Sequence, residues 1–110
     1  QNFSFVILGS KNDEFYGKKA TKDRLQKFFK ILCDKKRLDI IDLLGERPHY
    51  VQEMAEKLNL TSATISYHMN FLYSFDLVCS ERDEHRVYYS LNKEKAKSMF
   101  DEAVRTLLHQ

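Results

Sequence analysis

A chain of 110 residues is the length of a single domain, and 43% hydrophobic and 31% charged residues are typical of a soluble folded protein. The net charge at pH 7 is only +2, so total charge does not identify a partner. No apolar run approaches the roughly 20 residues of a membrane span, and no signal peptide is visible. With two cysteines and no secretory signal, we expect a reducing cytoplasm and no disulfide framework.

Residues 1–20 do not fit the remainder of the domain. The run from Phe3 to Leu8 has strand character, and Gly9 to Asp13 is predicted to end it as a turn or linker. A lone strand has nothing to pair with in a mostly helical domain. Because the chain also lacks an initiating Met, we expect residues 1–20 to be an arm or linker from an upstream domain. The alternative is a strand that pairs with its twin across a dimer.

Basic side chains are concentrated between positions 18 and 37, where only Asp23 and Asp34 oppose them. They are Lys18, Lys19, Lys22, Arg24, Lys27, Lys30, Lys35, Lys36 and Arg37. A solvated helix face is the ordinary interpretation of such a stretch, and a patch that faces DNA phosphates is the alternative.

Two amphipathic helices are predicted towards the ends of the domain, over residues 21–33 and 93–108. Their apolar residues recur at helical spacing: Leu25, Phe28, Phe29 and Leu32 in the first, and Ala96, Met99, Phe100, Ala103 and Leu107 in the last. Together these helices offer more apolar surface than one small core consumes. They either close the core of a monomer or form the interface of a dimer.

A helix-turn-helix is predicted in the middle of the chain, over residues 50–58 and 61–72. Only Asn59 and Leu60 separate its two helices. Thr61 is a good N-cap, because its hydroxyl can accept a hydrogen bond from the backbone N–H of Thr64. The apolar positions are Val51, Met54, Ala55 and Leu58 in the first helix and Ile65, Met69 and Leu72 in the second.

The opposite face of the second helix has the character of a surface that enters the DNA major groove. It carries Ser62, Ala63, Ser66, Tyr67 and Asn70, which are small or hydrogen-bonding groups without a carboxylate. Thr64 and His68 complete the candidate DNA-contacting set, although the spacing of His68 also suits a packed position at the core edge. A solvent-exposed polar face is the alternative for the whole set.

Residues 77–91 are predicted to form a hairpin around the polar tip Arg82–Arg86. In its second half Val87, Tyr89 and Leu91 alternate with Tyr88 and Ser90. A helix-turn-helix followed by a hairpin is a winged helix. The predicted fold is therefore mainly α with a small β-hairpin wing, in the order α-α-α-α-ββ-α, and Arg82 and Arg86 are candidates to grip the DNA backbone.

These elements resemble the ArsR/SmtB family of bacterial winged-helix repressors between about residues 25 and 91. The resemblance rests on Asp34, Arg37, Leu38, Ile40, Ile41, Leu44, Glu53-Met54-Ala55, Leu58, Leu60-Thr61, Thr64-Ile65-Ser66, His68-Met69, Leu72, Leu77-Val78 and Val87-Tyr88-Tyr89-Ser90-Leu91. It implies a homodimer formed by the terminal helices, with recognition helices at half-sites about one DNA turn apart. Two departures are Asp76 and Asp83-Glu84, where the family usually has glycine or a small turn residue. The second places two acids at the wing tip.

No catalytic or metal-binding constellation is visible in the sequence. His49, His68, His85 and His109 are scattered, with no His-x-x-x-His or Cys-x-x-Cys pair. Metal-sensing members of the resembled family carry ligands where this chain has Tyr50, Val51 and Gln52, or along the last helix, where it has Lys93, Lys95 and Arg105. Cys33 and Cys79 are predicted to be buried structural thiols.

The chain is therefore predicted to be a sequence-specific double-stranded-DNA-binding transcriptional regulator, a homodimeric repressor that is neither an enzyme nor a direct metal sensor and needs no cofactor. Residues 21–110 would form the DNA-binding domain. The dimer interface would comprise Leu25, Phe28, Phe29, Leu32, Met99, Phe100, Ala103 and Leu107. An upstream domain or a small-molecule effector would supply the signal. The alternative function is a winged helix that docks another protein within a larger chain.

Overall fold

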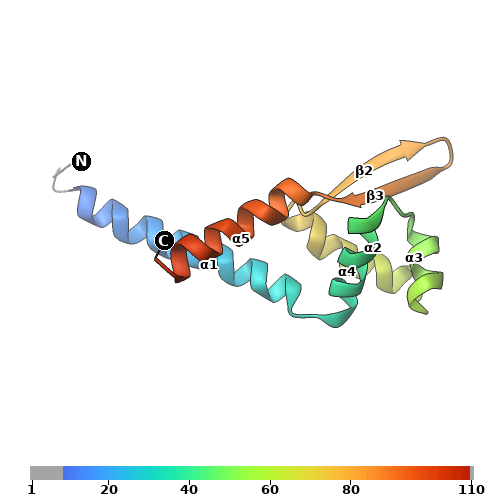
Figure 1. Cartoon of the computed structure of the whole chain (residues 1–110), viewed down its shortest axis with the longest axis horizontal. Helices are drawn as coiled ribbons and strands as arrows, with labels where there is room; N and C mark the ends of the chain where they lie inside the picture. The colour runs from blue at the N-terminus through green and yellow to red at the C-terminus, as the bar shows by residue number, and fades with distance from the viewer. Residues whose placement is uncertain (1–8, 110) are drawn as a thin grey trace.

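The computed structural model describes the backbone of residues 9–109 and the side chains of residues 19–109. Five helices and one antiparallel hairpin follow each other within this part of the chain (Figure 1). Their bounds are α1 Gly9–Leu32, α2 Lys35–Glu46, α3 Val51–Leu58, α4 Ser62–Ser74, β2 Val78–Asp83, β3 Arg86–Leu91 and α5 Lys93–Leu107. This order confirms the predicted winged helix-turn-helix.

Helix α1 begins earlier than the sequence indicated. It starts at Gly9 rather than near Thr21 and runs without a break across position 20, so the turn predicted at Gly9–Asp13 is wrong. Extending an existing helix adds one hydrogen bond per residue, whereas starting one is costly, so glycine and asparagine next to a long helix need not end it. The strand predicted at Phe3–Leu8 lies outside the described residues.

Side-chain caps determine where α2 and α4 begin. Asp34 Oδ1 accepts hydrogen bonds from the backbone N–H groups of Lys36, at 2.9 Å, and Arg37, at 3.4 Å. Thr61 Oγ1 accepts from the N–H of Thr64 at 3.1 Å, as predicted. Between α3 and α4, Asn59 has a left-handed backbone with φ 55° and closes the tight turn.

The helix-turn-helix is packed around the residues that helical spacing predicted to be apolar. Met54 of α3 and Ile65 and Leu72 of α4 have no exposed surface, and Met69 is 3% exposed. They share a core with Ile40 and Leu44 of α2 and with Leu77 and Val78 at the start of the hairpin. Burial of this apolar stripe fixes which face of α4 points outwards.

The wing is a regular two-stranded ladder that runs from the pair Val78–Leu91 to the pair Asp83–Arg86. The turn is therefore shorter than the predicted tip, since it contains only Glu84 and His85 outside the strands. Glu84 and Asp76 both have left-handed backbones, with φ 53° and 58°. Both positions are among those where the resembled family usually has glycine or a small turn residue, and acidic side chains adopt the conformation here.

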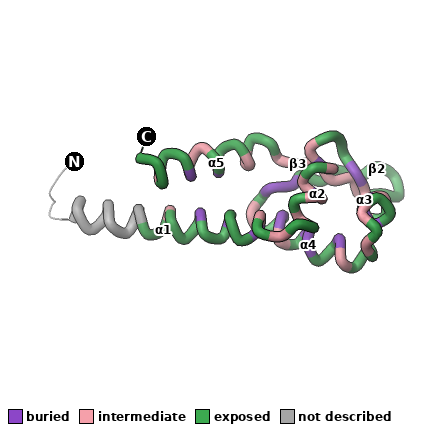
Figure 2. The backbone as a smooth tube through the Cα atoms, turned by 60° about the horizontal axis from the view of Figure 1, so that its bottom comes forward, coloured by how far each residue is buried: buried purple, intermediate pink, exposed green. Residues whose placement is uncertain are grey.

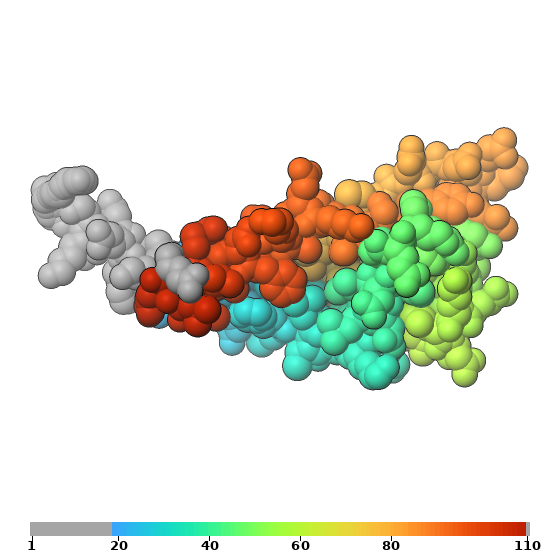
Figure 3. Space-filling view, viewed as in Figure 1, coloured from blue at the N-terminus to red at the C-terminus, as the bar shows by residue number. Residues whose placement is uncertain are grey.

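Helices α1 and α5 lie side by side and extend away from the helix-turn-helix (Figures 2 and 3). Leu25 and Phe28 of α1 and Met99 and Ala103 of α5 are buried, and Phe28 and Phe100 meet edge to face at 5.1 Å. An ion pair of 2.6 Å joins Arg24 to Glu102 across the two helices. Among the described helices, none is long and apolar enough to cross a membrane.

Candidate nucleic-acid interface

The outward face of α4 carries the five side chains predicted to lie there. Ser62, Ala63, Ser66, Tyr67 and Asn70 are all exposed, and Tyr67 has 59% of its surface accessible. No carboxylate occurs anywhere in α4. The face is therefore free to approach a polyanion without electrostatic repulsion from its own helix.

Tyr67 is the largest side chain of this face, and two neighbouring rings contact it. Its ring lies 5.2 Å from the His68 ring and 5.1 Å from the Phe71 ring, with both pairs close to perpendicular. Edge-to-face contacts of this kind are favourable and directional. The orientation of Tyr67 consequently depends on the residues that lie beneath it.

The remaining two candidates on α4 are partly or wholly withdrawn from the surface. Thr64 is half-buried, and its hydroxyl accepts a hydrogen bond of 2.9 Å from that of Thr61. His68 is only 5% exposed, so the predicted direct contact between His68 and DNA is wrong. Its alternative assignment, a packed and hydrogen-bonded histidine, is confirmed. Helical rotation places position 68 between Ile65 and Leu72, on the buried side.

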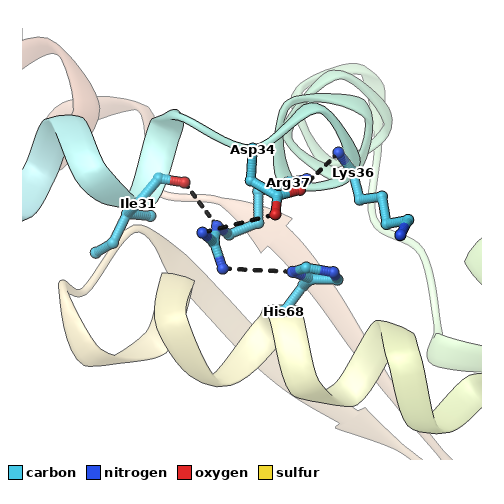
Figure 4. A network of polar contacts seen from close by, with 5 residues as sticks. All are labelled: Ile31, Asp34, Lys36, Arg37 and His68. Carbon is cyan, nitrogen blue, oxygen red and sulfur yellow. Dashed lines mark hydrogen bonds and ion pairs between the residues drawn. The ribbon is translucent and has the colours of Figure 1, made fainter.

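His68 belongs to a polar network centred on Arg37, whose side chain is only 11% exposed (Figure 4). Arg37 Nε donates to the carbonyl of Ile31 at 2.7 Å, and Nη1 lies 3.4 Å from His68 Nδ1. The guanidinium carbon is 4.4 Å from the centroid of the Phe71 ring. Arg37 also forms an ion pair with Asp34 at 3.8 Å. One side chain thus connects the end of α1, the start of α2 and the middle of α4.

From the sequence, Arg37 was assigned to the basic stretch and to the family resemblance, but not to a buried network. The signal that could have singled it out is its position three residues after the N-cap Asp34, where capping brings the two side chains together. Two other basic residues of the stretch also have acidic partners: Arg24 pairs with Glu102, and Lys35 with Asp39 at 3.2 Å. Lys19, Lys22, Lys27, Lys30 and Lys36 are exposed.

The ionisation of this network reflects its surroundings. Burial raises the pKa of the Asp34 carboxyl, but the backbone hydrogen bonds from Lys36 and Arg37 and the nearby positive charges together outweigh it and leave the pKa below its ordinary value. Burial lowers the pKa of His68 below 6.5, and the positive charges of Arg37 and Lys36 act in the same direction against Asp34. Both shifts favour an ionised Asp34 and a neutral His68.

The two wing arginines differ in their environment. Arg82 is exposed on β2, whereas the Arg86 guanidinium carbon lies 4.2 Å from the centroid of the Tyr50 ring. Tyr50 in turn meets Tyr88 edge to face at 5.6 Å. Stacking on an aromatic ring limits the rotamers of an arginine while leaving its N–H groups free to donate. Asp83 and Glu84 are exposed next to these cations.

The predicted dimer residues fall into two groups. Leu25, Phe28, Met99 and Ala103 are at most 7% exposed within one chain, so their assignment to an intersubunit interface is wrong, and they belong to the monomer core. Leu32 is half-buried. Phe29, Phe100 and Leu107 are 40%, 50% and 53% exposed. Packing of α1 on α5 thus buries part of the apolar surface of each helix and leaves the remainder exposed to solvent.

Cys33 and Cys79 are both exposed, so the prediction of buried thiols is wrong. Cys33 lies just beyond the last residue of α1, and Cys79 follows Val78, the buried residue of β2, at the start of its exposed part. Among the described residues, no group of three or more His, Cys, Asp or Glu side chains is arranged to hold a metal ion.

Comparisons with known proteins agree with this geometry. The sequence model described as "Bacterial regulatory protein, arsR family" matches residues 34–80. The transcriptional repressor SdpR of Bacillus subtilis (strain 168) is 34% identical over 64 residues, which are 58% of this chain and 71% of that protein. The arsenical resistance operon repressor of the same strain is 33% identical over 75 residues, covering 67% of this chain and 71% of that protein.

Solved structures share the fold. The homodimeric winged helix-turn-helix DNA-binding domain of a possible ArsR-family regulator from Mycobacterium bovis is 28% identical, with a TM-score of 0.67 over 79% of this chain and 82% of that one. An ArsR-like transcriptional regulator from Rhodococcus sp. RHA1 reaches a TM-score of 0.75 over 82% of this chain and 83% of that one, at 22% identity. With its exposed, acid-free recognition helix and its winged helix-turn-helix, this chain belongs to the ArsR family of DNA-binding transcriptional regulators.

Proposed function

We propose that this chain is a sequence-specific repressor of transcription that binds double-stranded DNA as a homodimer in the bacterial cytoplasm. The observation that carries the proposal is the α4 face formed by Ser62, Ala63, Ser66, Tyr67 and Asn70, all exposed and none acidic. These side chains would contact base edges or phosphates in the major groove. Arg82 and Arg86 would contact the flanking DNA backbone.

Asn70 is the residue most suited to read a base. Its amide can donate and accept at once, which matches the N6 and N7 positions of adenine, and such a pair contributes about 1–3 kcal/mol of discrimination. Tyr67 would contact a phosphate or a base through its hydroxyl, with its ring fixed by His68 and Phe71. The serines and Ala63 are small enough to let the helix approach the bases.

The dimer would form through the uncovered halves of α1 and α5. Phe29, Phe100 and Leu107 support this assignment, because large apolar side chains without a partner favour association. The Mycobacterium bovis relative is described as homodimeric. A two-fold axis between the α1/α5 pairs would present two copies of α4 to half-sites about one DNA turn apart.

DNA binding is tested by titrating labelled genomic fragments at several salt concentrations. We expect at least one fragment to bind specifically and the affinity to fall steeply with salt, because each neutralised phosphate releases counterions. Asn70→Ala and Tyr67→Ala should weaken binding to that fragment far more than binding to random DNA. Ser98→Ala is the matched control, since Ser98 is an exposed neutral residue of α5. The absence of any specific fragment would favour the protein-docking function instead.

We further propose that the chain does not sense a metal ion directly. Several relatives are named for arsenical or cadmium resistance, so direct metal sensing is the alternative that this proposal must exclude. In this chain, positions where the metal-sensing pattern requires ligands carry Tyr50, Gln52, Lys93, Lys95 and Arg105, and cationic side chains do not bind a cation. The signal would then come from a small molecule, or from an upstream domain joined through residues 1–20.

Calorimetry with zinc, nickel and cadmium tests this second proposal. We expect no site of micromolar or better affinity on the purified chain. Because Cys33 and Cys79 are exposed, Cys33→Ser and Cys79→Ser variants show whether any weak heat arises from a single thiol. A tight site whose occupation releases DNA would overturn the proposal.

A further inference from the structure

The contact between Arg37 and His68 has a chemical requirement. A guanidinium has only donors, so the contact of 3.4 Å between Arg37 Nη1 and His68 Nδ1 is attractive only if Nδ1 carries a lone pair. The ring must then be neutral, with its proton on Nε2. In the protonated ring both nitrogens are donors, and a second positive charge would lie against Arg37.

The charged groups around His68 come from the α1–α2 connection and from the first turn of α2. They are Asp34, Lys36 and Arg37, so two cations and one acid face the ring, while Tyr67 lies beside it on α4. Asp34 is already engaged by Arg37 and by two backbone N–H groups of α2. A protonated His68 ring would therefore be a buried positive charge with little to offset the cost of removing it from water.

The network connects the end of α1 to α4, the helix that carries the candidate DNA-contacting face. Arg37 donates a hydrogen bond to the carbonyl of Ile31, one of the last carbonyls of α1. A positive charge is also favourable there, because the C-terminal end of a helix carries partial negative charge. On α4 the same side chain contacts His68 and Phe71, and the rings of both residues contact Tyr67 (Figure 4 shows the polar part). Loss of the contact with His68 would remove a polar connection that orients α4 relative to α1.

We propose that Arg37 and His68 are positioning residues that hold α4 against the end of α1, and that specific DNA binding requires the neutral His68 ring with a free lone pair on Nδ1. The inference rests on the proposed function and adds a means of regulation to it. Acidification protonates His68, breaks the contact with Arg37 and lowers the affinity for the specific site. The direction follows from the lowered pKa of His68: the contact is complete above pH 6.5 and is lost as the pH falls through the pKa of the folded state.

The test compares the wild-type chain with His68→Asn at about pH 8 and about pH 5, well above and well below the ordinary histidine pKa. The Asn side chain places an amide oxygen near the position of Nδ1, so it keeps an acceptor for Arg37 but does not titrate. We expect both proteins to bind the specific fragment similarly at the higher pH. At the lower pH the wild type should lose affinity relative to His68→Asn, by at most about tenfold, the factor that corresponds to one ordinary hydrogen bond.

Two further variants separate this role from general effects of acid. His109→Asn removes an exposed histidine beyond the end of α5 and should keep the wild-type pH profile. Arg37→Lys keeps the positive charge but loses the planar fork of donors, so it should bind the specific fragment more weakly at both pH values, with a smaller pH step. Circular dichroism and thermal unfolding confirm that each variant is folded under the conditions of the titration.

Nitrogen NMR of the wild-type imidazole rings tests the inference without any variant. We expect His68 to be neutral at neutral pH, with hydrogen on Nε2. A ring with hydrogen on Nδ1, or a protonated ring, would overturn the inference. Identical pH profiles for the wild type and His68→Asn, with specific binding present, would overturn it as well. Absence of specific binding at every pH and salt concentration would instead overturn the proposed function, and the inference with it.

Discussion

The helix-turn-helix and the α1/α5 pair expose different kinds of large side chain. On α4, the exposed aromatic residues Tyr67 and Tyr73 carry hydroxyl groups, and the other large apolar residues of α3 and α4 are at least half-buried. On α1 and α5, the exposed large residues Phe29, Phe100 and Leu107 have no polar atom in their side chains. The first surface suits contact with water and nucleic acid, whereas the second gains free energy when another protein covers it.

Within the α1/α5 pair, some apolar residues are buried in the monomer and others are exposed to solvent. Phe28 is 1% exposed and contacts Phe75 and Phe100, with ring centroids 5.8 and 5.1 Å away, whereas Phe29 is 40% exposed. Adjacent positions on α1 therefore serve different purposes. Phe28 belongs to the monomer, and Phe29 is available to a partner.

The largest expected effect is that of Phe28→Ala. Truncation of a fully buried phenylalanine leaves a cavity, and we expect the free energy of unfolding to fall by about 3–5 kcal/mol. Urea denaturation followed by circular dichroism measures it. Phe29→Ala is the matched control and should mainly weaken the dependence of the unfolding midpoint on protein concentration. If both variants lost the same free energy of unfolding at every protein concentration, Phe29 would belong to the monomer core, as Phe28 does.

Phe100→Asp should have the next largest effect, on assembly. A charge at the centre of an apolar interface has no partner, so we expect a folded chain with the mass of a monomer in sedimentation equilibrium. Leu38→Asp is a suitable control, because Leu38 is 46% exposed but belongs to α2 and not to the α1/α5 pair. A dimer that survives Phe100→Asp would show that the interface lies on another surface.

The smallest expected effect concerns the helix-turn-helix itself. Thr61→Ala removes the hydroxyl that accepts from the Thr64 N–H at 3.1 Å and should lower the free energy of unfolding by about 1 kcal/mol. Thermal or urea unfolding measures the loss. Thr61→Ser keeps the acceptor and should lose much less. If serine destabilises as much as alanine, the methyl group of Thr61, and not its hydroxyl, matters at this position.

The helix-turn-helix could be predicted residue by residue because its signals are local. The spacing of Ile65, Met69 and Leu72 defines the buried face of α4, and the Thr61 cap defines its first turn. Both depend on neighbours within a few positions, which the order of residues contains. The outward direction of Ser66 and Asn70 follows from the same helical period.

The errors lie where the outcome depends on residues far apart in the chain. The burial of Phe28 and Met99 depends on how α1 packs on α5, and periodicity alone does not say how much of each apolar stripe that packing covers. Cys33 was expected on an apolar face, but α1 ends at Leu32 and leaves the thiol exposed. Arg37 was counted with the surface cations because its partner His68 lies 31 positions away.

The sequence by itself determined the order of elements, the capped helix-turn-helix, the presence of the hairpin and the acid-free face of α4, because each is specified by contacts between residues close in the chain. Only the tertiary structure decided which phenylalanines belong to the monomer core. It also decided that one arginine links α1, α2 and α4. These features depend on contacts between segments that are far apart in the chain, because close packing and the pairing of buried polar groups are settled only when those segments meet.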